Sequence, residues 1–114
     1  MRMLAHPART DIELTSVFHA LSDPVRLGIV VGLLHGGEQS TGGLAIPMHK
    51  SSLSHHLKIL REAGVTFTRI QGTRRFLSLR REDLEARFPG LLDAIAAAAH
   101  VPDRAPAPIR RYAA

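Results

Sequence analysis

Serine, histidine and lysine side chains gather in one short segment, KSSLSHHLKILREAG, at residues 50–64. Serine and histidine form the nucleophile and base of many hydrolases, and histidine also binds metals. Nucleophilic catalysis further needs an orienting group and a pocket. A serine and a histidine on one short helix, without a strained turn for the nucleophile, do not provide this arrangement. The segment therefore does not predict an enzyme.

Leucine spacing places the same segment on a helix with a single apolar stripe. Leu53, Leu57 and Leu60 lie at i, i+4 and i+7 and are expected to face inward. Gly64 is suited to end the helix. His56 falls on the buried flank and is interpreted as a packed structural histidine. The serines and lysines remain on the exposed side, where they are available for binding.

A strand-like pattern follows this helix and predicts a β-hairpin. Residues 65–70 are rich in β-branched and aromatic side chains, 71–73 form a turn, and 74–80 form a second strand. Three arginines lie near the tip of this hairpin: Arg69, Arg74 and Arg75.

Two helices are expected upstream. Residues 1–9 are expected to form a flexible arm, and a capping box from Thr10 to Glu13 starts the first helix at Thr10. Asp23 caps the second helix, and Pro24 fits its first turn. The first helix carries one apolar stripe: Leu14, Val17, Phe18 and Leu21. The expected buried face of the second helix is Leu27, Val30, Val31 and Leu34.

Shorter elements complete the domain. A helix around 40–45 must be short because two glycines and a proline interrupt it, and further helices are expected at 81–88 and 89–100. These elements are expected to form one folded domain over 10–100. The basic, proline-rich tail at 101–114 is expected to be disordered.

Composition limits the function classes. The 114 residues are 45% apolar and 4% aromatic, which suits one domain with a thin aliphatic core. Lys and Arg outnumber Asp and Glu by 15 to 10, which favours nucleic acid or another acidic partner. The absence of cysteine excludes thiolate metal sites. With no apolar run of roughly 18 residues and no signal-peptide core, a cytoplasmic protein without a membrane partner is expected.

A polar-faced helix followed by a basic hairpin predicts a winged helix-turn-helix, a mainly α fold with a small β-hairpin. Short polar side chains early in the recognition helix reach base edges, and hairpin arginines contact the neighbouring backbone or minor groove of double-stranded DNA. The domain over 10–100 is then expected to be the DNA-binding domain. The alternative is an ordinary solvated surface. The predicted DNA contacts are Lys50, Ser51, Ser52, Ser54, His55, Lys58, Arg69, Thr73, Arg74 and Arg75.

The segments ALSDPVRLGIV, SSLSHHLKILREAGV and QGTRRFLSL resemble the ArsR/SmtB family of bacterial transcription regulators, over about residues 14–96. The resemblance implies a homodimer that binds two-fold symmetric operators and often releases DNA when a ligand binds. GEQSTGGLA stands where the family's thiol-bearing ELCVC motif would be, so the usual thiolate sensing of arsenic, cadmium or persulfide is excluded. The resemblance implies an interface between the first and last helices, with candidates Leu14, Val17, Phe18, Leu91, Leu92 and Ile95.

Metal binding is a further hypothesis. Seven histidines without cysteine favour nitrogen and oxygen ligation of nickel or zinc. The resemblance implies a second type of metal site on the last helix. This chain holds only a fragment of that site, His100 and Asp103. A dimer could bring dispersed ligands together, and the alternative is scattered surface histidines. The candidate ligands are His6, Asp11, His19, His100 and Asp103.

Two other function classes stay open. One is a winged-helix protein-interaction module that acts through a partner polypeptide, with no metal sensing of its own. It would show no salt-sensitive affinity for DNA. The other is a small metal-handling protein or hydrolase, for which the sequence shows no pocket signature.

Overall fold

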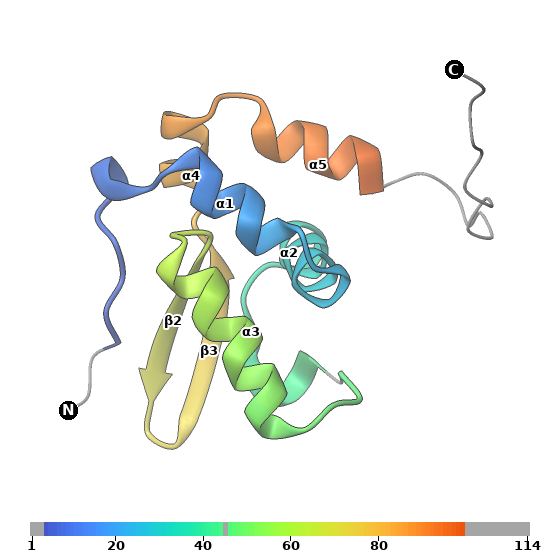
Figure 1. The fold of residues 1–114 in the computed structure, drawn as a ribbon. Helices are drawn as coiled ribbons and strands as arrows, with labels where there is room; N and C mark the ends of the chain where they lie inside the picture. The colour runs from blue at the N-terminus through green and yellow to red at the C-terminus, as the bar shows by residue number, and fades with distance from the viewer. Residues whose placement is uncertain (1–3, 45, 100–114) are drawn as a thin grey trace, which may run out of the picture.

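The computed structural model describes residues 4–44 and 46–99, and the tail expected at 101–114 lies outside them. Five α helices, three strands and two short 3-10 helices make up the described chain (Figure 1). In chain order these are η1 (Arg9–Asp11), α1 (Leu14–Leu21), α2 (Pro24–Gly36), β1 (Gln39–Ser40), η2 (Thr41–Leu44), α3 (Lys50–Glu62), β2 (Thr66–Gln71), β3 (Arg74–Leu79), α4 (Arg81–Arg87) and α5 (Leu91–Ala99).

The strands form an antiparallel sheet in the order β1-β3-β2, so β2 is an edge strand. β2 and β3 are the predicted hairpin, with Thr66 opposite Leu79 and Gln71 opposite Arg74. Gly72 in their turn has a φ of 61°, a left-handed conformation that glycine adopts without steric cost. Strand β1 is not among the expected elements, because two residues are too few to show the alternation of a strand.

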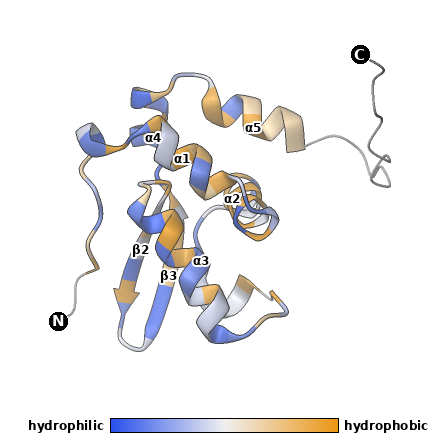
Figure 2. Cartoon of the chain, in the orientation of Figure 1, coloured by the Kyte–Doolittle hydropathy of each residue, from blue (hydrophilic) through white to orange (hydrophobic). Residues whose placement is uncertain are grey.

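The core is aliphatic, as the composition predicts. It joins the inner faces of the helices to the sheet, and hydrophobic residues are prominent in α1, α2 and α5 (Figure 2). Burial of these side chains is the main favourable term that holds α3 and the hairpin in place. The most deeply buried side chains include Val17, Val30, Leu33, Leu60, Leu77 and Leu84.

The first helix begins later than its sequence pattern predicts. Arg9–Asp11 form a 3-10 turn, and α1 starts only at Leu14, where Glu13 makes no side-chain cap bond. The predicted capping box and helix start at Thr10 are therefore wrong. Ile12 explains the difference, because its extended backbone (φ −75°, ψ 119°) separates the two helical segments and buries its side chain, which is 1% exposed.

The second helix buries a different face from the predicted one. Val30 is buried as predicted, but Leu27 is 38% exposed and Val31 is only half-buried. The cause is that α2 is apolar around most of its circumference, so periodicity cannot fix which side meets the core. The buried residues of α2 are Arg26, Ile29, Val30 and Leu33.

The remaining helices follow the prediction closely. The short helix around 40–45 is the single turn η2, which has no buried residue, and α4 and α5 lie within the expected ranges. Among the described residues, no single helix is long and apolar enough to cross a membrane. The pair α1 and α2 meets those criteria only when taken together, and it is bent by 103°.

Candidate nucleic-acid interface

The predicted recognition helix is α3, and its polar side is open to solvent. Within 50–62 only Leu60 is fully buried, while Leu53 and Leu57 are half-buried against the domain. The helix begins after His49, which makes no side-chain cap bond, so the first backbone N–H groups are available to an anion such as phosphate. The predicted contacts on this helix are all exposed: Lys50, Ser51, Ser52, Ser54, His55 and Lys58.

The turn between β2 and β3 and the start of β3 carry three of the predicted contacts. Thr73, Arg74 and Arg75 are all exposed. The guanidinium of Arg74 lies over the ring of Phe76, with its Cζ atom 5.0 Å from the ring centroid, which is a cation–π contact at an exposed position. Figure 1 shows this turn and the N-terminal end of α3 at the same end of the domain. The fold thus brings the predicted base-reading and backbone-binding side chains to one end of the molecule.

Arg69 differs from Arg74 and Arg75, the other two arginines of the β2–β3 hairpin, because it has an anionic partner within the protein. Its Nη2 donates to Oε1 of Glu38 at 2.8 Å, and its Nη1 donates to Oε1 of Gln71 at 2.8 Å. The bond from Arg69 lowers the pKa of Glu38, and the same bond raises the pKa of Arg69. Both side chains are exposed, so solvent screens the pair and it contributes little stability. A phosphate would have to compete with Glu38 for this guanidinium.

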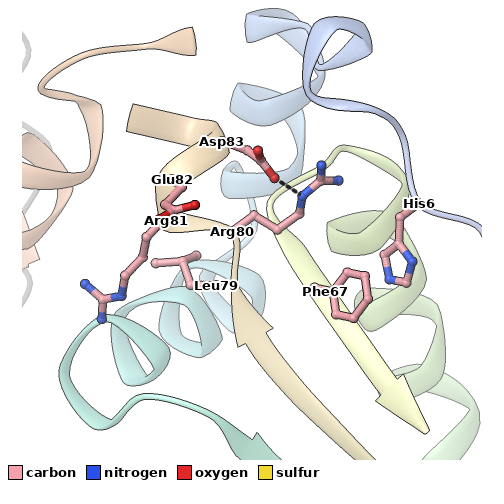
Figure 3. A pocket seen from close by; sticks show the side chains of 7 residues that line it. All are labelled: His6, Phe67, Leu79, Arg80, Arg81, Glu82 and Asp83. Atoms are coloured by element: carbon pink, nitrogen blue, oxygen red, sulfur yellow. Dashed lines mark hydrogen bonds and ion pairs between the residues drawn. The ribbon is translucent and has the colours of Figure 1, made fainter. Parts of the chain in front are cut away.

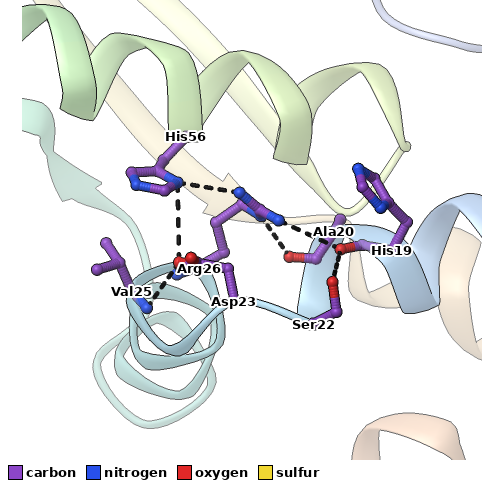
Figure 4. Close-up of polar contacts among 7 residues, drawn as sticks. All are labelled: His19, Ala20, Ser22, Asp23, Val25, Arg26 and His56. Atoms are coloured by element: carbon purple, nitrogen blue, oxygen red, sulfur yellow. Dashed lines mark hydrogen bonds and ion pairs between the residues drawn. The ribbon is translucent and has the colours of Figure 1, made fainter.

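The predicted structural role of His56 is confirmed. It is half-buried where α3 meets the corner between α1 and α2, with Nδ1 3.0 Å from Nη1 of Arg26 and 3.8 Å from Oδ2 of Asp23 (Figure 4). Asp23 caps α2 as predicted, because its Oδ2 accepts from the N–H groups of Val25 and Arg26. The bond from the Arg26 N–H lowers the pKa of Asp23.

Arg26 itself was missed by sequence reasoning. Its side chain is buried and donates from Nε to the carbonyl oxygen of Ala20 at 2.7 Å and from Nη2 to that of His19 at 3.3 Å. The signal that could have found it is a lone cation near the start of an otherwise apolar helix. Such a cation either points to solvent or has several acceptors inside the fold.

Residues 4–9, which were expected to form a flexible arm, lie beside β2 and the start of α4 (Figure 3). The Nε2 atom of His6 accepts a hydrogen bond from the N–H of Thr68 at 3.0 Å, and its ring stacks on Phe67 with centroids 4.2 Å apart. Burial lowers the pKa of His6, which favours the neutral imidazole that can accept this bond. The edge strand β2 is thereby covered at Thr68.

Arg80 and Asp83, around the start of α4, bind the same N-terminal segment at Pro7 and Arg9. Arg80 donates from Nη1 to the carbonyl oxygen of Pro7 at 2.7 Å and from Nε to Oδ2 of Asp83 at 2.9 Å. Arg9 donates to Oδ1 of Asp83 at 2.6 Å, and this bond lowers the pKa of Asp83. His6 and Arg80 also line a surface pocket (Figure 3), but the guanidinium of Arg80 is already committed to these protein acceptors.

The predicted metal ligands do not come together in the described residues. Within 4–44 and 46–99, no three His, Asp or Glu side chains form a group that could hold a metal ion, so His6, Asp11 and His19 do not form a site. His100 and Asp103 lie outside the described residues. A site shared between two protomers stays a prediction.

The predicted interface residues divide into two groups. Leu14 is 40% exposed and Phe18 is 52% exposed on α1, and Leu91 and Ile95 on α5 are half-buried. These four side chains have apolar surface left to contribute to a dimer. The other two have almost none, because the protomer itself already buries Val17 and Leu92.

Comparisons with known proteins place the chain in a family. A helix-turn-helix domain family matches residues 21–66. The HTH-type transcriptional regulator YceK of Bacillus subtilis (strain 168) is 39% identical over 82 residues, which cover 69% of this chain and 82% of that protein. An ArsR family transcriptional regulator of known structure is 28% identical, with a TM-score of 0.58, over 77% of this chain and 98% of that chain. The chain belongs to the ArsR family.

This ArsR family chain is also similar to the transcriptional repressor BigR from Xylella fastidiosa. The two are 32% identical with a TM-score of 0.60, and the match covers 81% of this chain and 96% of BigR. The resemblance found in the sequence and the winged helix-turn-helix fold are therefore confirmed. The chain is a transcription regulator, and its relatives are regulators rather than enzymes.

Proposed function

We propose that this ArsR family regulator binds operator DNA as a homodimer, with α3 in the major groove and the β2–β3 turn on the neighbouring backbone. One observation carries the proposal. The start of α3, whose polar residues are exposed, and the β2–β3 turn, which the exposed Arg74 and Arg75 follow in sequence, lie at the same end of the domain (Figure 1). A formal net charge of +5 adds long-range attraction to DNA.

The homodimer is supported by the apolar surface of α1. Phe18 is 52% exposed and Leu14 is 40% exposed one turn away, and large apolar side chains grouped in this way favour an interface. Two-fold symmetry would then present two α3 helices to successive major grooves, about 34 Å apart. The operator should accordingly contain two inverted half-sites.

The test is a binding titration of the full chain with DNA from upstream of its own gene and with a shuffled sequence, across a salt series. Operator DNA should bind more tightly, and the logarithm of the affinity should fall linearly with the logarithm of salt concentration. The double variant Arg74→Ala/Arg75→Ala should weaken binding to both DNAs alike. It should reduce the salt slope by about 1.8, at about 0.9 per lost phosphate contact.

A matched control keeps the charge at the same positions. Arg74→Lys/Arg75→Lys should keep the slope, because lysine also neutralises phosphate. If neither DNA bound with salt-dependent affinity, a winged-helix module acting through a partner polypeptide would replace this proposal. Response to nickel or zinc is a separate prediction, and its candidate ligands do not form a group within the described residues.

A further inference from the structure

The recognition helix has little apolar anchoring near the end that is proposed to read DNA. The one fully buried side chain of α3 is Leu60, close to its C-terminal end. The preceding turn η2 has no buried residue to brace it. Leu53 and Leu57 are only half-buried. Apolar burial therefore constrains the N-terminal half of α3 less than its C-terminal end.

Arg26 supplies a polar link between α3 and the end of α1. Its side chain belongs to α2, and the residue is 7% exposed. One guanidinium donates to the carbonyl oxygens of His19 and Ala20 and also lies 3.0 Å from Nδ1 of His56 (Figure 4). The carbonyl end of a helix carries partial negative charge, which favours a cation at this position. The three contacts fix the guanidinium plane, which a single bond would not do.

The chemistry of the contact defines the state of His56. A guanidinium can only donate hydrogen bonds, so Nδ1 of His56 must be the acceptor, and the ring proton is on Nε2. Asp23 lies on the same side, with Oδ2 3.8 Å from Nδ1, and caps the backbone N–H of Arg26 at 3.1 Å. The cap of α2 and the contact to α3 therefore fix the backbone and the side chain of the same arginine.

We propose that Arg26 is a positioning residue for operator recognition. Through His56 it holds the rotation of α3 relative to α1, and this sets the discrimination between operator and random DNA. His56 follows His55 directly and lies one helical turn beyond Ser52, so a rotation of α3 displaces both base-facing side chains together. Recognition groups must be held to within about 0.5 Å to work. The inference rests on the proposed DNA-binding function.

The experiment measures the ratio of operator affinity to random-DNA affinity, together with the unfolding free energy, for matched variants. Arg26→Lys removes the fork that reaches His56 and should lower the ratio about tenfold while leaving random-DNA affinity unchanged. Arg87→Lys is the control. Arg87 also bonds a backbone carbonyl, that of Ile12, through Nε and Nη2, but its bonds go to the N-terminal segment rather than to α3. It should cost stability without changing the ratio.

Variants of His56 keep the test decisive if Arg26→Lys does not fold. His56→Asn retains an acceptor close to the position of Nδ1 and should keep the wild-type affinity ratio. His56→Phe has no acceptor and should lower the ratio. In the double variant Arg26→Lys/His56→Phe the ratio should be no lower than in the more affected single variant, because the two changes remove the same contact between Arg26 and His56.

The outcomes separate this inference from the proposed function. If the wild-type chain did not distinguish operator from random DNA, the proposed function would fail. If it did distinguish them and folded Arg26→Lys kept the full ratio, the positioning role would be overturned. Equal ratios for His56→Asn and His56→Phe would also overturn it, since the acceptor would then be irrelevant.

Discussion

Gly64 and Ile12 are packed so closely that a Cβ atom on the glycine would lie 2.6 Å from Cγ1 of the isoleucine. Gly64 also has a φ of 82°, which side chains rarely tolerate. This glycine ends α3 and leads into β2, so one residue fixes both the exit of the recognition helix and its contact with the buried N-terminal segment.

Gly64→Ala should therefore lower the unfolding free energy by about 3 kcal/mol, through overpacking and left-handed strain together. Chemical denaturation measures this. Gly72→Ala is the control, because Gly72 has a φ of 61° but no atom within 4 Å of its virtual Cβ. It should cost about 1 kcal/mol, from backbone strain alone. Equal losses at the two positions would show that Ile12 moves away without cost.

Ser52→Ala and His55→Ala should lower discrimination between operator and random DNA, each by about 1 kcal/mol. Both side chains are exposed near the start of α3, which is proposed to read base edges. Competition binding with the two DNAs measures the effect. Lys58→Ala should instead weaken binding to both DNAs equally, because a phosphate contact carries no sequence information. A uniform loss in the serine and histidine variants would contradict base reading by this face.

Phe18→Glu should convert the dimer to a monomer, because it places a charge in the predicted apolar interface. Sedimentation equilibrium measures the association, and operator affinity should fall with it. Leu27→Glu is the matched control, since Leu27 is another partly exposed apolar residue, 38% exposed, but lies on α2 outside the predicted interface. A wild-type chain that stayed monomeric would contradict the homodimer directly.

Stability should depend on pH through His6. Burial lowers its pKa below 6.5, so between the folded pKa and 6.5 the unfolded chain binds more protons. The bond to Thr68 therefore stabilises the fold fully above about pH 6.5, and this contribution is lost as the pH falls through the folded pKa.

His6→Phe keeps a stacking ring beside Phe67 and removes the acceptor. It should flatten the decline in unfolding free energy as the pH falls below about 6.5. Amide exchange at Thr68 gives a local measurement, because the protection factor of this amide, which corrects for the intrinsic pH dependence of exchange, should fall at low pH in the wild-type chain. An unchanged pH profile in His6→Phe would rule out this contact as the cause.

Calorimetric titration of chelator-treated protein with nickel and then zinc tests the metal prediction. One ion per protomer is expected at about micromolar affinity, weakened in both His6→Ala and His100→Ala. A metal that binds His6 through Nε2 must break the bond to Thr68, so exchange at the Thr68 amide should rise when metal is added. The absence of any heat change with either ion would remove the metal hypothesis.

Local patterns predicted the elements whose two faces differ. The leucine spacing of α3 and the β-branched run of β2 identify both elements and their inward sides. The apolar circumference of α2 could not select a face, and its orientation depends on Arg26 reaching acceptors on other elements. The start of α1 was missed for a related reason, since burial of Ile12 overrides the cap-like residues around it.

The exposure of the predicted DNA contacts on α3 follows from helix phase alone, and so it was predictable. Pairs that join distant segments were not. Arg26 and His56 are 30 residues apart, and Arg69 and Glu38 are 31 residues apart. No local period links such positions. The sequence shows that Arg69 is a cation near the wing, but only the fold shows that a carboxylate already binds it.

The N-terminal segment has a consequence for the order of events during synthesis. His6, Pro7 and Arg9 contact residues that lie 62, 73 and 74 positions further along the chain. At about 5–20 residues per second, a ribosome needs about 3 to 15 seconds to make those partners after the segment itself. The segment is therefore synthesised first but can dock only after its partners on β2 and around the start of α4 have been made. Docking of this segment therefore requires that synthesis has passed the β2–β3 hairpin and the start of α4.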